Sequence, residues 1–301
     1  MIIIYSDDFL KHNKENHPEN KNRLIAIKNI LDEKGYKTIE PKPIKNVENE
    51  IKNVHSEEYV NFIKSIRSNT ILDFDTYLTK ETFKVSIKAV EASINAAEYA
   101  LDKKHSFALV RPPGHHACKN KGMGFCIFNN IAIASQYILN KKDAKKVLIL
   151  DIDAHHGNGT QEIFYYRNDI FYISLHQYPA YPGTGSEKEI GKGKGKNFNL
   201  NIPLPPYTND EEYLKKLEIF RKVALEYNPD LILVSAGYDT YKDDPLTQMS
   251  ITIEGFEKIS KYIKETAKML DVGVAFILEG GYNLKGLSHG VLETINVFSF
   301  S

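Results

Sequence analysis

Two carboxylates and two imidazoles follow one another within residues 151–156, where they could bind a divalent metal ion. They come directly after four apolar residues, 147–150, which are typical of a strand that is buried on both faces. Side chains alternate along a strand, so Asp151, Asp153 and His155 are expected to point the same way. A carboxylate and a neutral imidazole that converge at a strand end suit zinc first among the divalent ions. The alternative is structural, with a capping aspartate and two histidines that are hydrogen-bonded within the fold.

Further polar groups follow three other segments that the sequence predicts to be strands. His115 and His116 come after the first of these, Asp239 after the next and Tyr282 after the last. The carboxyl ends of parallel strands meet at one edge of a sheet, so these groups are expected in one crevice. Two metal ligands from one strand and a carboxylate from another would leave one position open, as catalytic zinc sites do. The paired histidines would then serve acid–base chemistry, and the tyrosine hydroxyl would stabilise a developing oxyanion. Each residue alone is more often structural, but their joint placement favours a catalytic site.

Segments with the patterns of strands and helices alternate along the chain around these residues. The predicted strands are 2–5, 107–110, 147–153, 170–175, 231–235 and 274–278. The predicted helices are 24–31, 57–68, 83–101, 127–139, 161–166, 210–227 and 252–270. This alternation predicts an α/β fold with a mostly parallel central sheet between two layers of helices. No linker or repeat divides the sequence, so residues 1–301 are expected to form a single domain.

Two segments between these elements are predicted to be loops. Residues 69–77 contain Asp73 and Asp75 and have no clear period. Residues 176–199 contain several glycines but lack both the Walker spacing and the GxGxxG spacing. The second segment is therefore expected to be a flexible, solvated loop and not a phosphate-binding loop.

The composition excludes several classes of protein. Lysine plus arginine and aspartate plus glutamate both number 39, and this zero formal charge argues against a dedicated nucleic-acid binder. The two cysteines, Cys118 and Cys126, lie in one segment and form no disulfide framework, which indicates a reducing compartment. The N-terminus does not resemble a signal peptide, and no apolar run is long enough to span a membrane. These features predict a soluble, cytoplasmic protein.

A set of motifs in this chain resembles the histone deacetylase family, which includes prokaryotic deacetylase-like proteins and acetylpolyamine amidohydrolases. The motifs are RPPGHHA (111–117), GFCIFNN (124–130), DIDAHHGNGTQ (151–161), SLH (174–176), YPGTG (181–185), AGYD (236–239) and LEGGYN (278–283). They occur in the family's order and cover nearly the whole chain, from residue 17 to 282. The resemblance implies a three-layer α/β/α sandwich of the arginase/deacetylase type. GNGT and EGGY are more similar to the class II and prokaryotic branch.

The resemblance also implies which ions the chain binds. One zinc ion per chain would be held by Asp153, His155 and Asp239, with iron(II) as the alternative ion in the cell. A structural potassium ion would lie near Asp151 and Ser174.

For catalysis, the resemblance assigns His116 as the general base and acid. His115 would be its electrostatic neighbour, oriented by Asp151, and Tyr282 would polarise the acyl carbonyl alongside the zinc. Asn158 stands where some relatives have an aspartate behind the second histidine, so His116 is expected to be less basic here.

For substrate binding, the resemblance implies a narrow tunnel with a polar rim. Asp75 resembles the rim carboxylate that accepts hydrogen bonds from the substrate backbone, and Arg23 matches an arginine of the inner acetate channel. The remaining residues would line the tunnel around the acyl-lysine stem and its mouth: Gly124, Phe125, Tyr181 and Leu246.

The leading interpretation is a zinc-dependent amidohydrolase that removes acetyl or other acyl groups from lysine side chains. The main alternative is an acetylpolyamine deacetylase acting on a small acetylated amine. Leu246 stands where polyamine-selective relatives place an acidic residue, which favours the lysine substrate, although Asp75 could also attract a polyamine. A catalytically silent binding protein of this fold would lack a metal ligand or Tyr282, and an arginase-like enzyme would carry further aspartates for a second metal. The sequence leaves the natural substrate, the acyl chain length and the oligomeric state open, and predicts no nucleic-acid or membrane partner.

Overall fold

The computed structural model describes residues 1–141 and 143–299 and is built around a seven-stranded sheet. The strands lie in the order β1-β4-β9-β8-β5-β6-β7, and each neighbouring pair is parallel. Their bounds are β1 (Ile2–Ile4), β4 (Ser106–Ala108), β5 (Val147–Asp151), β6 (Ile170–Gln177), β7 (Asn199–Leu204), β8 (Leu231–Ala236) and β9 (Val274–Leu278). The predicted α/β fold with a mostly parallel sheet is confirmed.

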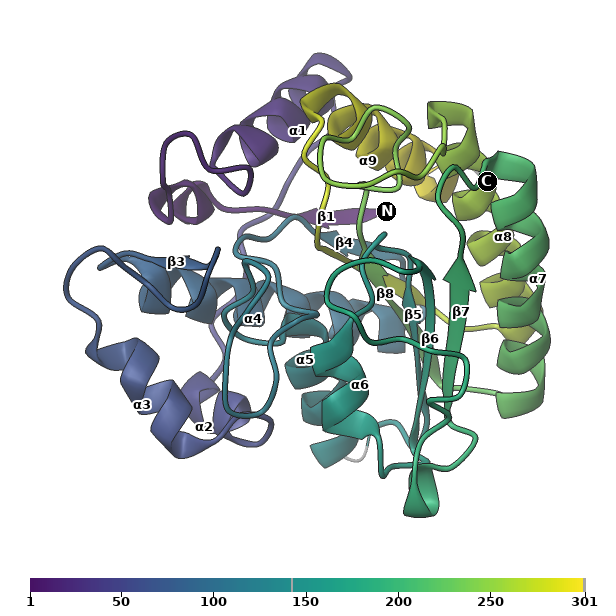
Figure 1. Cartoon of the computed structure of the whole chain (residues 1–301), viewed down its shortest axis with the longest axis horizontal. Helices are drawn as coiled ribbons and strands as arrows, with labels where there is room; N and C mark the ends of the chain where they lie inside the picture. The colour runs from purple at the N-terminus through teal and green to yellow at the C-terminus, as the bar shows by residue number, and fades with distance from the viewer. Residues whose placement is uncertain (142, 300–301) are drawn as a thin grey trace.

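Helices cover both faces of this sheet (Figure 1). On one face lie α4 (Thr82–Leu101), α5 (Asn130–Asn140) and α6 (Asn158–Phe164). On the other face lie α1 (Asn22–Glu33), α7 (Asp210–Tyr227), α8 (Ile253–Leu270) and α9 (Leu284–Ser299). The shorter elements are η1 (Asp7–Lys11), α2 (Val47–Lys52), α3 (Glu57–Ser65), the hairpin strands β2 (Thr70–Ile71) and β3 (Tyr77–Leu78), and η2 (Gly193–Gly195). In the described residues, no helix is both long and apolar enough to cross a membrane.

The central strand β5 is buried along its whole length. It pairs with β8 on one side and β6 on the other, and helices cover both faces, so residues 147–150 have no exposed surface. Burying an aliphatic side chain of this size stabilises the fold by about 1.5–3 kcal/mol. This strand therefore gives the residues that follow it a rigid base.

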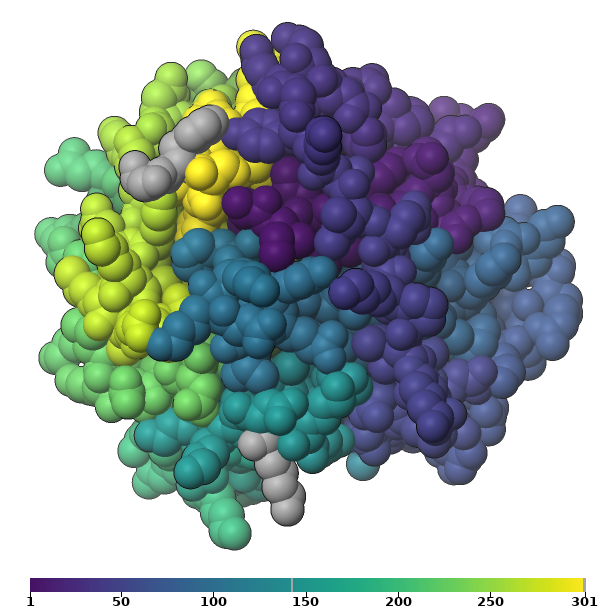
Figure 2. Space-filling view, turned by 180° about the vertical axis from the view of Figure 1, so that it is seen from behind, coloured from purple at the N-terminus to yellow at the C-terminus, as the bar shows by residue number. Residues whose placement is uncertain are grey.

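The chain ends pack together on the far side of the molecule. Figure 2 shows the N-terminal segment in purple beside the C-terminal segment in yellow. Helices α1 and α9 are in contact, and the Tyr36 hydroxyl donates a hydrogen bond to Asn296 Oδ1 at 2.7 Å. The N-terminal residues are thereby fixed to the segment that follows β9.

The structure differs from the sequence prediction at β5. The strand ends at Asp151 and not at Asp153, because the carboxylate of Asp151 accepts the backbone N–H of Asp153 at 3.2 Å. This local bond competes with the strand's hydrogen-bond ladder and turns the chain.

Several elements lie where no regular structure was predicted: η1, α2, the hairpin of β2 and β3 within the predicted loop 69–77, η2, β7 and α9. The segment 176–199 is bounded by the extended end of β6 and by β7, and it contains the short helix η2. Helix α9 was missed although its buried residues follow a helical period: Leu287, Val291, Ile295 and Phe298.

Candidate active site

Three side chains predicted to bind a metal converge beyond the carboxyl ends of β5 and β8. One ligand atom each from Asp153, His155 and Asp239 lies within 4.8 Å of the other two. Nδ1 of His155 is 3.1 Å from Asp153 Oδ1 and 2.9 Å from Asp239 Oδ2. Both carboxylates are fully buried. Two carboxylate oxygens and one imidazole nitrogen are a donor set that zinc accepts, and three protein ligands leave a position open.

The electrostatics of this cluster also suit a cation. Burial and the negative charge of Asp153 raise the pKa of Asp239 to about 7. A bound divalent ion would offset the repulsion between the two carboxylates and keep both ionised. The residues present therefore fit a zinc ion.

Backbone groups hold both carboxylates in place. The second oxygen of Asp153 accepts the N–H of Gly280 at 2.8 Å, and Asp239 accepts the N–H of Ala154 at 2.8 Å. A Cβ atom at Gly280 would lie 2.4 Å from Asp239 Oδ2 and 2.6 Å from Asp153 Oδ2. Only glycine permits the loop after β9 to approach the cluster this closely.

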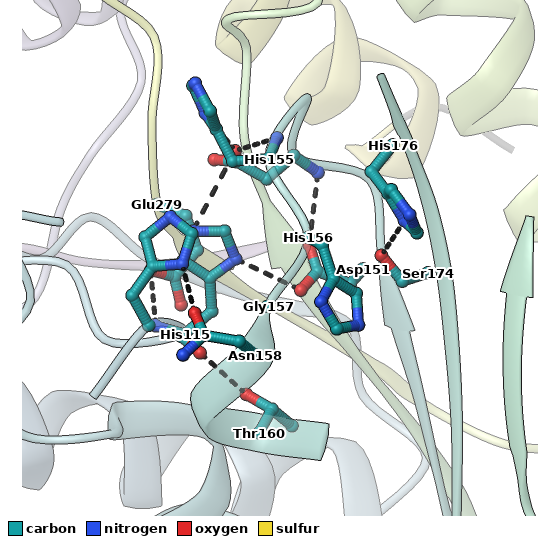
Figure 3. Close-up of polar contacts among 12 residues, drawn as sticks. His115, Asp151, His155, His156, Gly157, Asn158, Thr160, Ser174, His176 and Glu279 are labelled. Atoms are coloured by element: carbon teal, nitrogen blue, oxygen red, sulfur yellow. Dashed lines mark hydrogen bonds and ion pairs between the residues drawn. The ribbon is translucent and has the colours of Figure 1, made fainter. Parts of the chain in front are cut away.

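Asp151 does not join the three converging side chains. Its Oδ2 accepts hydrogen bonds from the Tyr172 hydroxyl at 2.9 Å and, at 3.1 Å, from Nδ1 of His115 (Figure 3). Asp151 is the last residue of β5, and Asp153 and His155 lie in the turn after it, so the alternation expected to align all three side chains does not extend past Asp151. Asp151 contacts His115, the residue that the resemblance expects it to orient.

The paired histidines have opposite protonation preferences. Their ring centroids are 4.0 Å apart. Burial opposes protonation of His115, but the negative charges of Asp153 and Asp151 outweigh it and raise the pKa of His115 to about 10. Burial and the positive charges of His115 and His155 lower the pKa of His116 well below its ordinary value. At neutral pH one imidazole is thus a cation and the other a neutral base.

Asn158 fixes which nitrogen of His116 carries the hydrogen. Nδ1 of His116 lies 2.8 Å from Oδ1 of Asn158, while the amide nitrogen of Asn158 contacts the sulfur atoms of Cys118 and Met123. An amide oxygen can only accept, so Nδ1 of His116 is the donor. Its Nε2 keeps a lone pair and can accept a proton.

Tyr282 is held by contacts on several sides. Its backbone N–H donates to Asp244 Oδ2 at 2.7 Å, and the ring of Phe125 meets its ring edge-on at 5.6 Å. The guanidinium of Arg23 lies 5.0 Å from the ring centroid and donates to the carbonyl oxygen of Gly281 at 2.7 Å. Burial raises the pKa of Tyr282 well above 10, so its hydroxyl remains a hydrogen-bond donor.

Arg23 itself is fully buried and surrounded by acceptors. Besides the Gly281 carbonyl it donates to the carbonyl oxygen of Glu279 and, at 3.2 Å, to the carboxylate of Glu19. The structure therefore places this predicted channel residue behind the turn that carries Tyr282.

The residues predicted to wall a tunnel lie around the histidines. Tyr181 meets the His116 ring edge-on at 5.2 Å, and Gly124 packs against both. Gly124 has φ +54°, and a Cβ atom there would lie 2.5 Å from His116, so a larger residue would displace the base. Tyr181 and Leu246 are each 43% exposed, which places them at the solvent side of the site.

Asp75 lies in the loop between β2 and β3, half-buried. Its carbonyl oxygen accepts a hydrogen bond from His17 Nε2 at 2.9 Å, and the next residue, Thr76, accepts the N–H of Phe125 at 3.0 Å. Burial and the charge of Asp73 raise the pKa of the Asp75 carboxyl. The predicted rim residue is thus connected through its neighbour to Phe125, which the resemblance places in the tunnel wall.

The region predicted to hold potassium lies where Asp151 of β5 is paired with Ser174 of β6. The hydroxyl of Ser174 is 2.9 Å from Nδ1 of His176. The sequence assigned His156 no role in the reaction. Its Nδ1 is hydrogen-bonded to the Thr184 hydroxyl and its Nε2 to the side-chain oxygen of Gln161.

Sequence reasoning gave no role to three buried carboxylates. Glu19 accepts hydrogen bonds from Arg111 and Arg23, Asp244 holds the Tyr282 loop, and Glu279 accepts the N–H of His115. A signal was present for Glu19, since an arginine that opens a buried motif needs a buried acid as its partner.

Comparisons with known proteins agree with this geometry. The profile of the histone deacetylase domain matches residues 17–298. A protein described as a probable deacetylase from Archaeoglobus fulgidus is 40% identical over 294 residues, which are 94% of this chain and 82% of that protein. Histone deacetylase 10, chloroplastic, from rice is 37% identical over 99% of this chain and 73% of its own length.

Two solved structures share the fold over almost the whole chain. The HD domain of HDA15 superposes with a TM-score of 0.92 at 32% identity and covers 99% of this chain and 88% of that one. An acetylpolyamine aminohydrolase from Burkholderia pseudomallei gives a TM-score of 0.89 at 26% identity, covering 99% and 98%.

Proposed function

The chain belongs to the histone deacetylase family, and from this premise we propose that it is a zinc-dependent amidohydrolase acting on acylated lysine side chains. The observation that carries the proposal is the convergence of Asp153, His155 and Asp239 beside a pair of histidines with opposite charge preferences. The zinc ion would be held by these three residues. When bound, zinc supplies a Lewis acid that polarises the amide carbonyl and lowers the pKa of water.

The side chains of this chain would carry the proton transfers. Nε2 of His116 accepts a proton from the attacking water as the new C–O bond forms. The same nitrogen returns that proton to the amine as the C–N bond breaks, so that a carboxylic acid and a free amine are released. His115, held cationic by Asp151, stabilises the negative charge that develops next to it. The hydroxyl of Tyr282 donates a hydrogen bond to the former carbonyl oxygen.

The substrate class follows from the residues at the mouth. Tyr181 and Phe125 offer aromatic faces for the methylene stem of a lysine, and Leu246 supplies no charge to meet a second ammonium group. Asp75 would accept hydrogen bonds from a peptide backbone. A potassium ion near Asp151 and Ser174 and a cytoplasmic location are further parts of the proposal.

A second candidate is an acetylpolyamine deacetylase. The similar structure from Burkholderia pseudomallei is named as an acetylpolyamine aminohydrolase, and Asp75 could attract a distal ammonium group. The substrates of the two candidates differ only in the part that would lie outside the tunnel, which is a peptide backbone in one case and a distal ammonium group in the other.

The test is amine release by the zinc-loaded protein from acetyl-lysine peptides and from acetylputrescine, measured side by side. We expect higher kcat/KM on the peptides, and abolition of both activities in His116→Ala. Preference for acetylputrescine would favour the second candidate. Absence of turnover on acetyl and longer acyl substrates, with zinc bound, would contradict both.

A further inference from the structure

A second group of metal-binding side chains lies directly beside the site described above. One ligand atom each from His115, Cys126 and Glu279 lies within 4.8 Å of the other two, and all three residues are buried. They come from the loop after β4, the segment before α5 and the end of β9. This group contains the sulfur that the Asp153–His155–Asp239 cluster lacks.

The free atoms of this group can be identified from the hydrogen bonds. Oε2 of Glu279 accepts the N–H groups of Gly114 and His115 at 2.7 and 3.1 Å, whereas its Oε1 is buried without a hydrogen-bond partner. Nδ1 of His115 faces Asp151, which leaves Nε2, 3.8 Å from Asp153 Oδ1 and so next to the first cluster. Figure 3 shows Glu279 beside His115. An unpaired buried carboxylate oxygen costs free energy unless a ligand or ion meets it.

The backbone already supports Cys126 as a ligand. Its sulfur accepts the N–H of His116 at 3.4 Å. Such a bond stabilises a thiolate more than a thiol, because the acceptor then carries charge.

The ligand types select the ion. Thiolate, imidazole and carboxylate together suit zinc, cadmium and cobalt(II), and do not suit magnesium or calcium, which require oxygen ligands. Binding of a divalent ion to Cys126 displaces the thiol proton, because the thiolate and not the thiol is the metal ligand.

We propose that His115, Cys126 and Glu279 form a second, inhibitory site for a thiophilic divalent metal ion. An ion there takes Nε2 of His115, whose ring lies 4.0 Å from that of His116, and stands beside the proposed base, so amide hydrolysis stops. The inhibition rests on the proposed function, whereas the binding does not.

The binding test is a spectroscopic titration of the zinc-loaded protein with cobalt(II). Sulfur-to-cobalt charge transfer absorbs in the near ultraviolet, and Asp153, His155 and Asp239 provide no sulfur. We expect one equivalent of cobalt to produce this band. It should be lost in Cys126→Ser, and the cobalt affinity should fall at least about tenfold in Glu279→Gln. The matched control is Cys118→Ser, which should keep the band because Cys118 is the other cysteine of the chain.

A rate measurement completes the test. Cadmium in excess over the zinc-loaded protein should inhibit amine release. With each variant's rate normalised to its own rate without cadmium, Cys126→Ser should raise the inhibitory concentration of cadmium at least about tenfold. Circular dichroism verifies that the variants are folded. Absence of the band, its persistence in Cys126→Ser, or its loss in Cys118→Ser would overturn the proposed site. A band in a protein that hydrolyses none of the substrates would refute only the proposed function, and an active protein without the band would refute only this site.

Discussion

Asn158 determines the tautomer of His116 without placing a negative charge beside the ring. Its amide oxygen fixes the hydrogen on Nδ1, while burial and two neighbouring imidazoles keep the pKa of His116 low. A neutral base with a low pKa is unprotonated over a wide pH range but is weaker as an acceptor. The asparagine therefore favours activity that persists at acidic pH.

This argument predicts the pH profile of Asn158→Asp. A carboxylate on Nδ1 favours the imidazolium and raises the pKa of His116. The base must be unprotonated to act, so the acid limb of the kcat/KM profile should move to higher pH. Asn158→Ala is the control, because it removes the acceptor without adding charge and should lower the rate without that shift.

Tyr282→Phe tests the hydroxyl as an oxyanion donor. We expect kcat to fall by about 10²–10³-fold, as for other single donors of this kind, with little change in KM. Zinc content measured by mass spectrometry should stay the same. Tyr166→Phe is the matched control, since that tyrosine is exposed beyond α6. A normal kcat for Tyr282→Phe would contradict the role of the hydroxyl as an oxyanion donor.

The convergence of Asp153, His155 and Asp239 was predictable at the residue scale, because residue type and spacing carry the signal. The end of β5 at Asp151 and the position of Glu279 were not, because a hydrogen bond from side chain to backbone ends β5 and a buried carboxylate reaches a loop 165 residues away. Neither contact leaves a local pattern in the sequence.

Among the elements, the loop that follows Asp239 connects the tunnel mouth to Tyr282. The carboxylate of Asp244 accepts the N–H of Leu246 at 3.0 Å and the N–H groups of Tyr282 and Asn283 at 2.7 and 3.1 Å. One buried side chain thus positions a predicted rim residue and the predicted oxyanion donor.

Asp244→Ala should therefore damage catalysis although Asp244 need not touch the substrate. Misplacing Tyr282 by about 1 Å would lower kcat/KM by about a hundredfold. The measurement is steady-state amine release with zinc content verified. Asp243→Ala is the control, because the side chain of Asp243 is exposed and the hydrogen bond from Asn283 goes to the backbone carbonyl of Asp243, which alanine keeps. Equal effects of the two substitutions would contradict this role.

Most elements were predictable because their apolar periods are strong. Helix α7 and strand β9 were predicted at the bounds they have, and α4 within one residue. Strand β7 was not, since its alternation begins inside a glycine- and lysine-rich segment. Its position depends on pairing with β6, which is a tertiary contact.

At the scale of the whole molecule, a buried ionic network joins the N-terminal segment to the site. Glu19 and Arg111 form a bidentate pair, and Arg23 extends it to the Tyr282 turn. Burial opposes ionisation of Glu19, but the two arginines outweigh it and lower its pKa from 4.5 to about 2. A lowered carboxyl pKa stabilises the folded state above pH 4.5, and this contribution is lost as the pH falls through 2.

Glu19→Gln should lower the free energy of unfolding by about 3–5 kcal/mol at neutral pH, because it leaves buried guanidinium groups without a counter-charge. The loss should shrink below pH 4.5, where the wild type loses the same interaction. Denaturant unfolding across pH measures both effects. Glu48→Gln, which removes an exposed pair with Lys64, is the control and should cost about 0–1 kcal/mol. A similar loss for both variants would refute the network's contribution.

The position of β9 has a consequence for the order in which the protein is made. β9 lies between β4 and β8. Until residues 274–278 have been synthesised, the sheet therefore exists as two separate parts, β1 with β4 and β8 with β5, β6 and β7. Each part then presents an unpaired apolar edge, which is the kind of surface that aggregates or recruits chaperones. The loop after β9 supplies Gly280, Tyr282 and the carbonyl groups that Arg23 binds across 256 to 258 residues. A nascent chain therefore has neither a continuous sheet nor Tyr282 until the same late segment leaves the ribosome, so an incomplete chain also lacks the proposed oxyanion donor.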